Sequence, residues 1–309
     1  MSVTSATHTK HVLITGASGG IGSALARCYA RPGTRLTLWG RKPEALAQLA
    51  DSCRGLGAQT AVVCQDTREL EKTRAMLTSI DLAAPLDLVF LNAGVNSGTH
   101  PDGSMESPPE ACRTMQVNAL GTINMASAIL QRMLVRNAGR IVLTSSLAGL
   151  YPLPDFAAYS ASKVAVAYYA KSMRAYASAS QVKISVIYPG YVDTDMANRL
   201  TGLQPMRWAP EKAAAYIQRK VDRGAGTIVF PRLLALGTCV LHLLPGRMAD
   251  FFAKKFSFTV EPDQEAKRMN DHACVESRNL TGVPNNHGSC CMQTDDKPTP
   301  VNNSNEGDA

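Results

Sequence analysis

The sequence predicts an α/β fold in which a doubly wound, seven-stranded parallel sheet is covered by helices on both faces. Three observations support this. Short apolar segments recur along the first 230 or so positions, helical segments of about ten residues or more separate them, and glycine-containing or polar turns follow them. Near-continuous apolar strands that alternate with helices are typical of a buried parallel sheet. With right-handed crossovers, strands are added on both sides of the first strand, and the connecting helices cover both faces of the sheet.

The individual elements follow from local patterns. Runs rich in Val, Ile, Leu and Thr predict strands, and longer segments with apolar residues on one side predict helices. In chain order the predicted strands are 11–15, 35–39, 61–64, 86–91, 141–144, 183–188 and 227–230. The predicted helices are 23–29, 42–53, 67–80, 111–136, 157–178 and 210–222. Pro43 suits the first turn of its helix, and Pro189-Gly190 ends the sixth strand.

Four chemically distinctive positions stand where strands end: Gly16, Asn92, Ser146 and Pro189. In an open parallel sheet, ligands bind in the crevice beyond the carboxyl ends of the strands. We therefore expect these four residues to lie near one another and near a ligand.

Three segments organise the chain of 309 residues, of which 45% are hydrophobic and 18% charged. Residues 1–232 hold the predicted sheet and are expected to form one domain, and 233–260 are predicted to form an amphipathic helical extension. Residues 261–309 are polar and lack periodicity, which predicts a disordered tail. That tail carries nine acidic and four basic residues, a net charge of −5, so residues 1–260 carry +12.

Composition also bounds location and partners. No apolar run of about 20 residues occurs, and the first residues lack the apolar stretch of a secretory signal, so we expect a cytoplasmic protein. Eight cysteines without framework spacing fit a reduced compartment, and no metal site is predicted. The basic body suits a phosphate-bearing cofactor, an acidic carrier or an anionic membrane surface. Nucleic acid is not expected, because no basic helix or interleaved aromatic-basic stretch occurs.

Tyr159 and Lys163 lie four residues apart on a predicted helix, so both side chains stand on one face. A phenol ionises near pH 10 in water, and a neighbouring ammonium group lowers that pKa toward neutrality. Ser146 supplies a hydroxyl that can bind the substrate oxygen that Tyr159 protonates. Such pairs are also common on solvated helix faces, so the rest of the chain has to support a catalytic role.

The segment TGASGGIG places Gly16, Gly20 and Gly22 between the first strand and the first helix. Glycines there allow a tight turn and bring the backbone close to a pyrophosphate at the helix N-terminus. With further strand–helix units behind it, this segment indicates dinucleotide binding.

These motifs together resemble the short-chain dehydrogenase/reductases in their compact, single-domain form. The resemblance covers roughly residues 8–232. It is carried by TGASGGIG, Asn92-Ala93-Gly94, Asn118, Ser146, Tyr159-Ser160-Ala161-Ser162-Lys163 and Pro189-Gly190-Tyr191-Val192-Asp193-Thr194, in the order and spacing of that family. It implies a Rossmann-type fold that reduces carbonyls or oxidises alcohols, and a homodimer or homotetramer formed through helices 111–136 and 157–178.

The resemblance also assigns roles to residues. It implies that Tyr159 is the acid in reduction and the base in oxidation, and that Lys163 binds the nicotinamide ribose and lowers the Tyr159 pKa. It implies that Ser146 orients the carbonyl and that Asn118 anchors a water in the proton relay. The implied cofactor-binding residues are Gly16, Ser18, Gly20, Ile21, Gly22, Asp66, Asn92, Gly94, Tyr159, Lys163, Pro189, Val192 and Thr194.

The end of the second strand bears on the choice of cofactor. An acidic residue there binds the ribose 2′-hydroxyl of NAD and repels a 2′-phosphate. This chain has Gly40-Arg41-Lys42 instead, and Arg41 offers a fork of donors to a phosphate. A solvated charge at a helix start is the competing interpretation. We expect NADP, with NAD as the alternative.

Two segments are expected to flank the substrate. Residues 150–156 and the lid-like 191–208 contribute eight large side chains, about half of which we expect only to close the core: Tyr151, Leu153, Phe156, Tyr191, Met196, Leu203, Met206 and Trp208. The others favour a mostly apolar substrate without fixing its skeleton. Together with the reaction that the resemblance implies, they lead us to expect a small hydrophobic ketone, alcohol or acyl thioester. Residues 233–256 are too short to span a bilayer and are open to three roles: lying on a membrane surface, roofing the pocket, or a subunit contact. We hypothesise peripheral membrane association.

Two other functions are compatible with parts of the sequence. A dinucleotide-binding sensor or scaffold without catalysis would keep the fold but has no need of Ser146, Tyr159, Lys163 and Asn118 together. A sugar-nucleotide epimerase or dehydratase would need a larger C-terminal substrate domain, whereas only about 70 residues follow Pro189-Gly190 before the polar tail.

Overall fold

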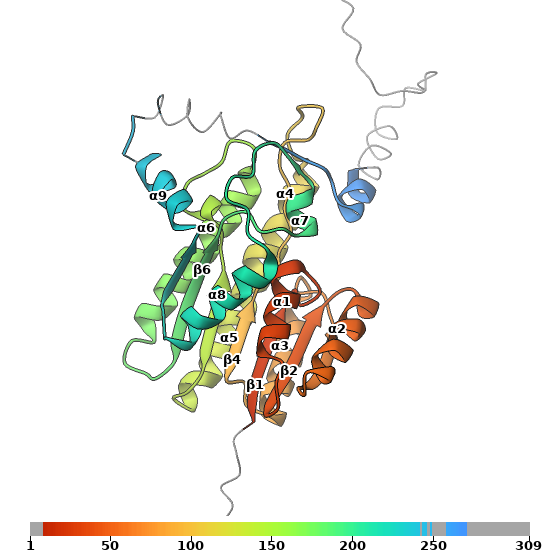
Figure 1. Cartoon of the computed structure of the whole chain (residues 1–309), viewed down its shortest axis with the longest axis vertical. Helices are drawn as coiled ribbons and strands as arrows, with labels where there is room; N and C mark the ends of the chain where they lie inside the picture. Colours follow the sequence, from red (N-terminus) through yellow and green to blue (C-terminus); the bar gives the residue numbers. More distant parts are fainter. Residues whose placement is uncertain (1–8, 242, 246–247, 249–257, 271–309) are drawn as a thin grey trace, which may run out of the picture. The chain divides into compact units, whose positions relative to one another are not determined.

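The computed structural model describes residues 9–241, 243–245, 248 and 258–270. Seven parallel strands form one sheet in the order β3-β2-β1-β4-β5-β6-β8, which confirms the predicted fold class (Figure 1). The strands are β1 (Lys10–Thr15), β2 (Thr34–Gly40), β3 (Gln59–Cys64), β4 (Leu88–Leu91), β5 (Arg140–Thr144), β6 (Lys183–Pro189) and β8 (Thr227–Phe230). The strand order reverses between β1 and β4, so the binding crevice is expected beyond their carboxyl ends.

Helices cover both faces of this sheet. One face carries α1 (Gly20–Tyr29), α2 (Pro43–Gly55) and α8 (Pro210–Asp222), and the other carries α3 (Leu70–Ala83), α5 (Thr122–Val135) and α6 (Ala157–Tyr176). Alternation along β1 shows why: Val12 and Ile14 belong to the first core cluster, whereas Leu13 belongs to the second. Successive strand residues point to opposite faces, so an apolar run buries both.

The helix expected over 111–136 is interrupted. It consists of α4 (Pro108–Met115), a π-helical segment η1 (Gln116–Gly121) and α5. A capping box between Ser107 and Glu110 starts α4, with Pro108 in its first turn. A π-helical insertion is uncommon and frequently lies at a functional site. Here η1 carries Asn118.

The C-terminal part is more ordered than the sequence predicts. The extension begins as α9 (Arg232–Leu241), and β9 (Thr259–Val260) pairs antiparallel with β7 (Leu200–Thr201), which follows α7 (Asp195–Asn198). Residues 264–270 are helical, so the tail expected to be disordered from position 261 is ordered to position 270. Buried Phe258 and Val260 and several arginine contacts hold it, and such long-range contacts leave no periodic pattern.

The remainder of the C-terminal predictions lies outside the described residues. The chain divides into two units, residues 1–270 and 271–309, and the second lies wholly outside the described ranges. Much of the segment 233–256, for which peripheral membrane association is hypothesised, also lies outside: residues 242, 246–247 and 249–256. In the part of the chain that the structure describes, none of the helices combines the length and the apolar character that a membrane span requires.

Candidate active site

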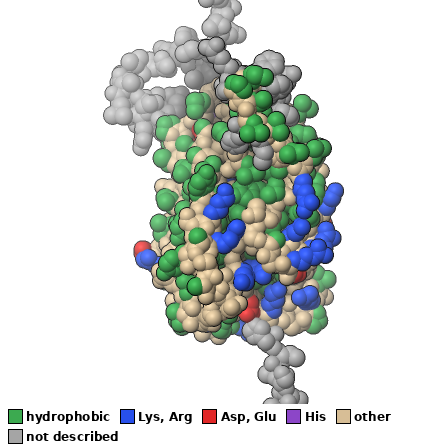
Figure 2. Space-filling model, turned by 90° about the vertical axis from the view of Figure 1, so that its left-hand side faces the viewer, with side chains coloured by type: hydrophobic (Ala, Val, Ile, Leu, Met, Phe, Trp, Pro, Cys, Tyr) green, Lys and Arg blue, Asp and Glu red, His purple; other side chains and the backbone are tan. Residues whose placement is uncertain are grey.

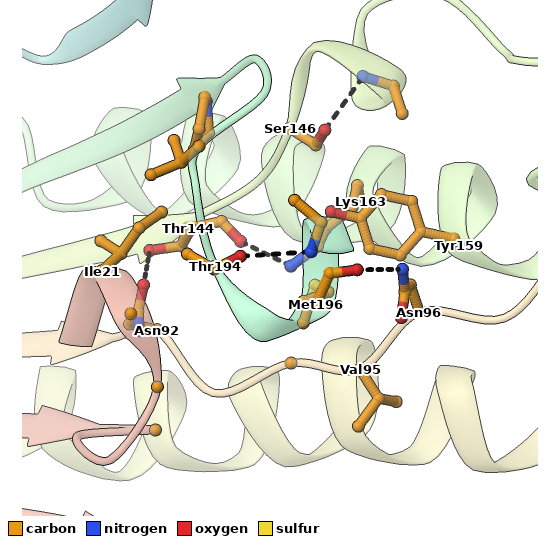
Figure 3. A pocket seen from close by; sticks show the side chains of 18 of the residues that line it. Ile21, Asn92, Val95, Asn96, Thr144, Ser146, Tyr159, Lys163, Thr194 and Met196 are labelled. Carbon is orange, nitrogen blue, oxygen red and sulfur yellow. Dashed lines mark hydrogen bonds between the residues drawn. The ribbon is translucent and has the colours of Figure 1, made fainter. Parts of the chain in front are cut away.

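A cavity of about 1300 Å³ opens beyond the carboxyl ends of β1, β4, β5 and β6, where the fold predicts a ligand. Most of the site residues predicted from the sequence line it: Gly16, Ser18, Gly20, Ile21, Arg41, Asp66, Asn92, Gly94, Ser146, Tyr159, Lys163, Pro189, Val192 and Thr194. Gly22 and Asn118 do not line it. Figure 3 shows how the side chains from β5, α6 and the loops after β1, β4 and β6 converge.

The glycine turn between β1 and α1 has no room for side chains. Gly16 adopts φ +62°, and a Cβ there would stand 2.8 Å from the Ala93 Cα. A Cβ on Gly20 would overlap the Thr194 methyl group, and one on Gly22 would overlap the Gly16 carbonyl oxygen. Gly22 therefore acts by letting α1 approach the turn rather than by touching a ligand.

Threonines that the sequence analysis did not single out fix the strand ends. The Thr15 hydroxyl accepts hydrogen bonds from the backbone N–H groups of Asn92 (2.9 Å) and Ala93 (3.0 Å), which joins the end of β1 to the end of β4. Thr144 donates its hydroxyl to the Asn92 side-chain oxygen at 3.4 Å. Thr15 begins the TGASGGIG segment, whereas no motif marks Thr144, because a threonine at a strand end is common.

Lys163, Tyr159 and Ser146 meet in the centre of the cavity (Figure 3). Lys163 is 4% exposed, and its ammonium group donates a hydrogen bond to the Thr144 carbonyl at 3.1 Å. The same nitrogen lies 5.5 Å from the centre of the Tyr159 ring, which packs against Phe156. Ser146 precedes the short helix η2 (Leu147–Gly149), accepts the Ala148 N–H at 3.1 Å and hydrogen-bonds Tyr159.

Burial dominates the electrostatics of this group. It lowers the pKa of Lys163 to about 8, because the charged form is desolvated. It raises the pKa of Tyr159, and the hydrogen bond with Ser146 only partly opposes this. Desolvation is thus the largest influence on the Tyr159 pKa, and the net shift is upward. That Lys163 lowers the Tyr159 pKa stays a prediction.

The buried ammonium group makes folding stability depend on pH. Between pH 8 and pH 10.5, Lys163 is neutral in the native state but still protonated in the unfolded chain. The unfolded state then binds more protons, so native stability rises with pH across this window. We expect wild type to gain about 2 kcal/mol relative to Lys163→Met between pH 7 and pH 10.

Urea unfolding of both proteins at several pH values measures this difference. The tyrosines titrate in both proteins, so their contribution cancels in the subtraction. Parallel stability curves for wild type and Lys163→Met would contradict the assignment of a buried, readily neutralised Lys163.

Two serines, Ser145 and Ser146, follow β5 and have different surroundings. The Ser145 hydroxyl is 1% exposed and donates to the Lys163 carbonyl at 2.8 Å, so it joins β5 to α6. The neighbouring Ser146 hydrogen-bonds the Tyr159 hydroxyl group. This arrangement favours Ser146 as the hydroxyl available to a substrate oxygen.

Asn118 is fully buried and holds the loop after β4. Its side-chain oxygen accepts the Val95 N–H at 2.8 Å, and its amide nitrogen donates to the Val95 carbonyl (2.9 Å) and to the Ser162 hydroxyl (3.0 Å). Ser162 lies beside Lys163 on α6. The Asn118 side chain thus fixes the position of the β4 loop relative to α6, and it does not reach the cavity.

The end of the cavity beyond Tyr159 is apolar. Of the eight large residues expected there, Leu153, Phe156, Tyr191 and Met196 line the cavity. Tyr151, Leu203, Met206 and Trp208 do not, and Trp208 stacks on Phe230 in the core. Helix α9 and the residues after it complete the lining with Leu233, Leu234, Leu236, Gly237, Thr238, Val240, Leu241 and Leu244.

The opposite end of the cavity is strongly charged. Arg41 and Asp66 lie there as predicted, together with charged residues that the sequence analysis did not select: Arg113, Arg199, Asp263, Glu265 and Arg268. Arg113 precedes Asn118 by five residues, and Asp263 and Glu265 belong to the segment expected to be disordered. No local pattern identifies such residues. Among the described residues, no group of three or more His, Cys, Asp and Glu side chains could hold a metal ion.

Comparisons of the sequence with known proteins identify a family and several relatives. The family model described as short chain dehydrogenase matches residues 10–203. An uncharacterized oxidoreductase of Myxococcus xanthus is 32% identical over 245 residues, which cover 79% of this chain and 96% of that protein. The dehydrogenase/reductase SDR family member 7B of Bos taurus is 33% identical over 194 residues, which cover 60% of this chain and 59% of the bovine protein.

Solved structures share the fold. A short-chain dehydrogenase/reductase from Burkholderia phymatum in complex with NAD has a TM-score of 0.68 at 24% identity, covering 76% of this chain and 93% of its own. A short-chain dehydrogenase from Sphingobium yanoikuyae in complex with NADPH has a TM-score of 0.65 at 19% identity, covering 91% and 99%. The family match spans more than half of the chain, and the Myxococcus relative spans most of it. The chain therefore belongs to the short-chain dehydrogenase/reductase family of oxidoreductases.

Proposed function

We propose that this protein is an NADP(H)-dependent oxidoreductase that acts on a hydrophobic ketone, alcohol or acyl-thioester carbonyl, with Tyr159 as the acid and base. One observation carries the proposal. The glycine turn and the Ser146, Tyr159 and Lys163 group face a single cavity that is charged at one end and apolar at the other. A dinucleotide needs the charged end, and a hydrophobic substrate needs the apolar end.

The residues present fit a nicotinamide dinucleotide. The turn at Gly16 and Gly20 leaves no space for a Cβ and places the backbone and the N-terminus of α1 at the cavity wall. Ser18 and Ile21 extend this wall, and Asn92 and Gly94 continue it along the end of β4. When bound, the cofactor supplies the hydride chemistry, while the protein supplies position and electrostatics.

The protein groups act on the proton and on the substrate oxygen. Tyr159 would donate its phenolic proton to the carbonyl oxygen in reduction and accept it in oxidation, and Ser146 would hold that oxygen in place. Lys163 stands next to the Tyr159 ring with a pKa of about 8. It can therefore exchange a proton in the working pH range and bias the charge of the phenol. Asn118 would keep these groups in register through Ser162 and the β4 loop.

The charged end favours a phosphorylated ribose. No acidic side chain ends β2, which finishes at Gly40 and is followed by Arg41 and Lys42. A second guanidinium group, that of Arg68, shares the Asp66 carboxylate with Arg41; the Asp66 oxygen lies 2.7 Å from Arg68 and 3.5 Å from Arg41. Two guanidinium groups offer the forked donors that suit a 2′-phosphate.

Titration with NADPH and NADH, followed by cofactor fluorescence, tests this preference. We expect wild type to bind NADPH more tightly than NADH, and Arg41→Ala to weaken NADPH binding about tenfold because one charge-assisted contact is lost. NADH binding should change little. Arg54→Ala, which removes an exposed arginine from α2, is the matched control and should leave both Kd values unchanged. Equal or tighter NADH binding by wild type would overturn the NADP assignment.

The apolar end supports the substrate class. Helix α9 lines the cavity with leucines that are also open to solvent, with Leu233 at 64% and Leu236 at 60% exposure. Figure 2 views the side of the molecule on which α9 lies and shows hydrophobic side chains near its upper end. These exposed leucines support the proposed contact of 233–256 with a membrane surface, for which vesicle co-sedimentation is the test.

Formation of a homodimer or homotetramer stays a prediction.

A further inference from the structure

The segment 258–270 returns to the charged end of the cavity and is firmly attached at its start. Strand β9 pairs with β7, and the Val260 N–H donates to the Thr99 carbonyl at 2.7 Å. The Phe258 N–H donates to Asp155 at 3.1 Å, and its ring packs on Phe156. At the other end, the Ser107 hydroxyl donates to the Asn270 side chain at 2.7 Å. Residues between these attachments, Asp263 to Glu265 and Arg268, line the cavity.

Asp263 anchors the middle of this segment. One carboxylate oxygen accepts the Ala266 N–H at 2.9 Å and so caps the helical stretch 264–270. The other oxygen accepts a hydrogen bond from Arg113 at 2.7 Å and lies 3.7 Å from Arg199. Arg113 is 3% exposed. A buried arginine needs a paired anion, and Asp263 provides one.

Glu265 contacts three arginines at the charged end of the cavity. Its carboxylate lies 2.7 Å from Arg41, 2.7 Å from Arg68 and 3.0 Å from Arg113. Burial works to raise the Glu265 pKa, but the hydrogen bond to Arg41 and the nearby arginine charges lower it below its usual range. Glu265 is therefore ionised at neutral pH and occupies donors of both arginines that the NADP proposal assigns to a phosphate.

We propose that Glu265 is a specificity-determining residue that competes with the 2′-phosphate of NADP(H) for Arg41 and Arg68. This inference rests on the proposed function, which assigns those two arginines to the phosphate. The four arginines of this cluster (Arg41, Arg68, Arg113 and Arg199) and the carboxylates of Asp66, Asp263 and Glu265 sum to a net charge of +1, and without Glu265 the sum is +2. A 2′-phosphate must replace Glu265, whereas the 2′-hydroxyl of NAD(H) has no such need.

The competition has a defined consequence for cofactor choice. If NADP(H) binds only to molecules in which the segment is displaced, its apparent affinity is its intrinsic affinity multiplied by the fraction of such molecules. The segment therefore weakens NADP(H) binding and leaves NAD(H) binding largely unaffected. The segment therefore reduces the difference in affinity between NADP(H) and NAD(H) that Arg41 and Arg68 would otherwise create.

The test compares Kd values for NADPH and NADH in the full chain carrying Glu265→Gln, at one fixed ionic strength. We expect Glu265→Gln to tighten NADPH binding about tenfold, the effect of one partly exposed charge-assisted contact, and to leave NADH binding nearly unchanged. Glu261→Gln is the matched control. It removes the same charge from the same segment, but its side chain is exposed and makes no ion pair among the described residues.

Hydrogen exchange on the wild-type chain tests the same competition without a variant. Exchange over residues 261–270 should increase with NADPH and change less with NADH. Unchanged or weaker NADPH binding by folded Glu265→Gln would overturn the role of Glu265, as would equal exchange with both cofactors. A separate measurement, the wild-type Kd values, tests the proposed function. The proposed NADP(H) dependence is wrong if wild type binds NADH at least as tightly as NADPH.

Discussion

Replacement of Tyr159 by Phe is expected to lower kcat by about three orders of magnitude, within the range measured for loss of a general acid or base. The ring and its contact with Phe156 stay, so the cavity keeps its shape. Only the hydroxyl that hydrogen-bonds Ser146 is removed. The Kd for NADPH should therefore stay close to that of wild type.

The assay follows NADPH oxidation with a panel of aromatic and alicyclic ketones. Tyr168→Phe is the matched control, because Tyr168 lies on the same helix with 65% exposure and should keep wild-type turnover. A Tyr159→Phe enzyme with kcat within about tenfold of wild type would show that another group delivers the proton.

Replacement of Gly22 by Ala should disrupt the glycine turn between β1 and α1. The added methyl group would overlap the Gly16 carbonyl oxygen and lie 3.0 Å from the Ala17 Cα, and both are backbone atoms that cannot rotate away. The turn and α1 must separate. We expect a loss of about 1–3 kcal/mol in folding stability, as for other overpacked sites. NADPH binding should weaken on the order of 100-fold, because the N–H groups of the turn no longer converge.

Gly55→Ala provides the comparison for Gly22→Ala. Gly55 is the last residue of α2, and no atom lies within 4 Å of a Cβ added there. Alanine at this position should therefore stabilise the protein by up to about 1 kcal/mol. Urea unfolding and NADPH titration measure both variants. Unchanged stability and NADPH binding in Gly22→Ala would mean that the turn is less tightly packed than described.

The sheet and the pairing of Tyr159 with Lys163 could be predicted because their information is local. Continuous apolar strands such as β5 and the four-residue spacing of Tyr159 and Lys163 each need only a short stretch of sequence. The glycine turn is local too, although the close contact between Gly22 and Gly16 within it becomes visible only in three dimensions.

The charged end of the cavity could not be predicted, because it depends on pairs that are distant in the chain. Glu265 contacts Arg41 across 224 positions, and Asp263 contacts Arg113 across 150. A polar segment without periodicity is typical of disorder, and its two carboxylates acquire partners only when the fold brings the arginines together. The Tyr159 pKa is a similar case, since burial depends on the assembled cavity.

Direct detection of hydride transfer tests the central claim most closely. The purified protein is incubated with a panel of hydrophobic ketones and NADPH that carries deuterium at both C4 positions of the nicotinamide, and the alcohols formed are examined by mass spectrometry. We expect deuterium on the carbinol carbon with wild type and its near absence with Tyr159→Phe. The contrary result is a folded wild-type protein that binds NADPH but transfers no deuterium to any ketone, and that transfers none to NADP from alcohols deuterated at the carbinol carbon. That result would contradict the account and favour a dinucleotide-binding sensor or scaffold.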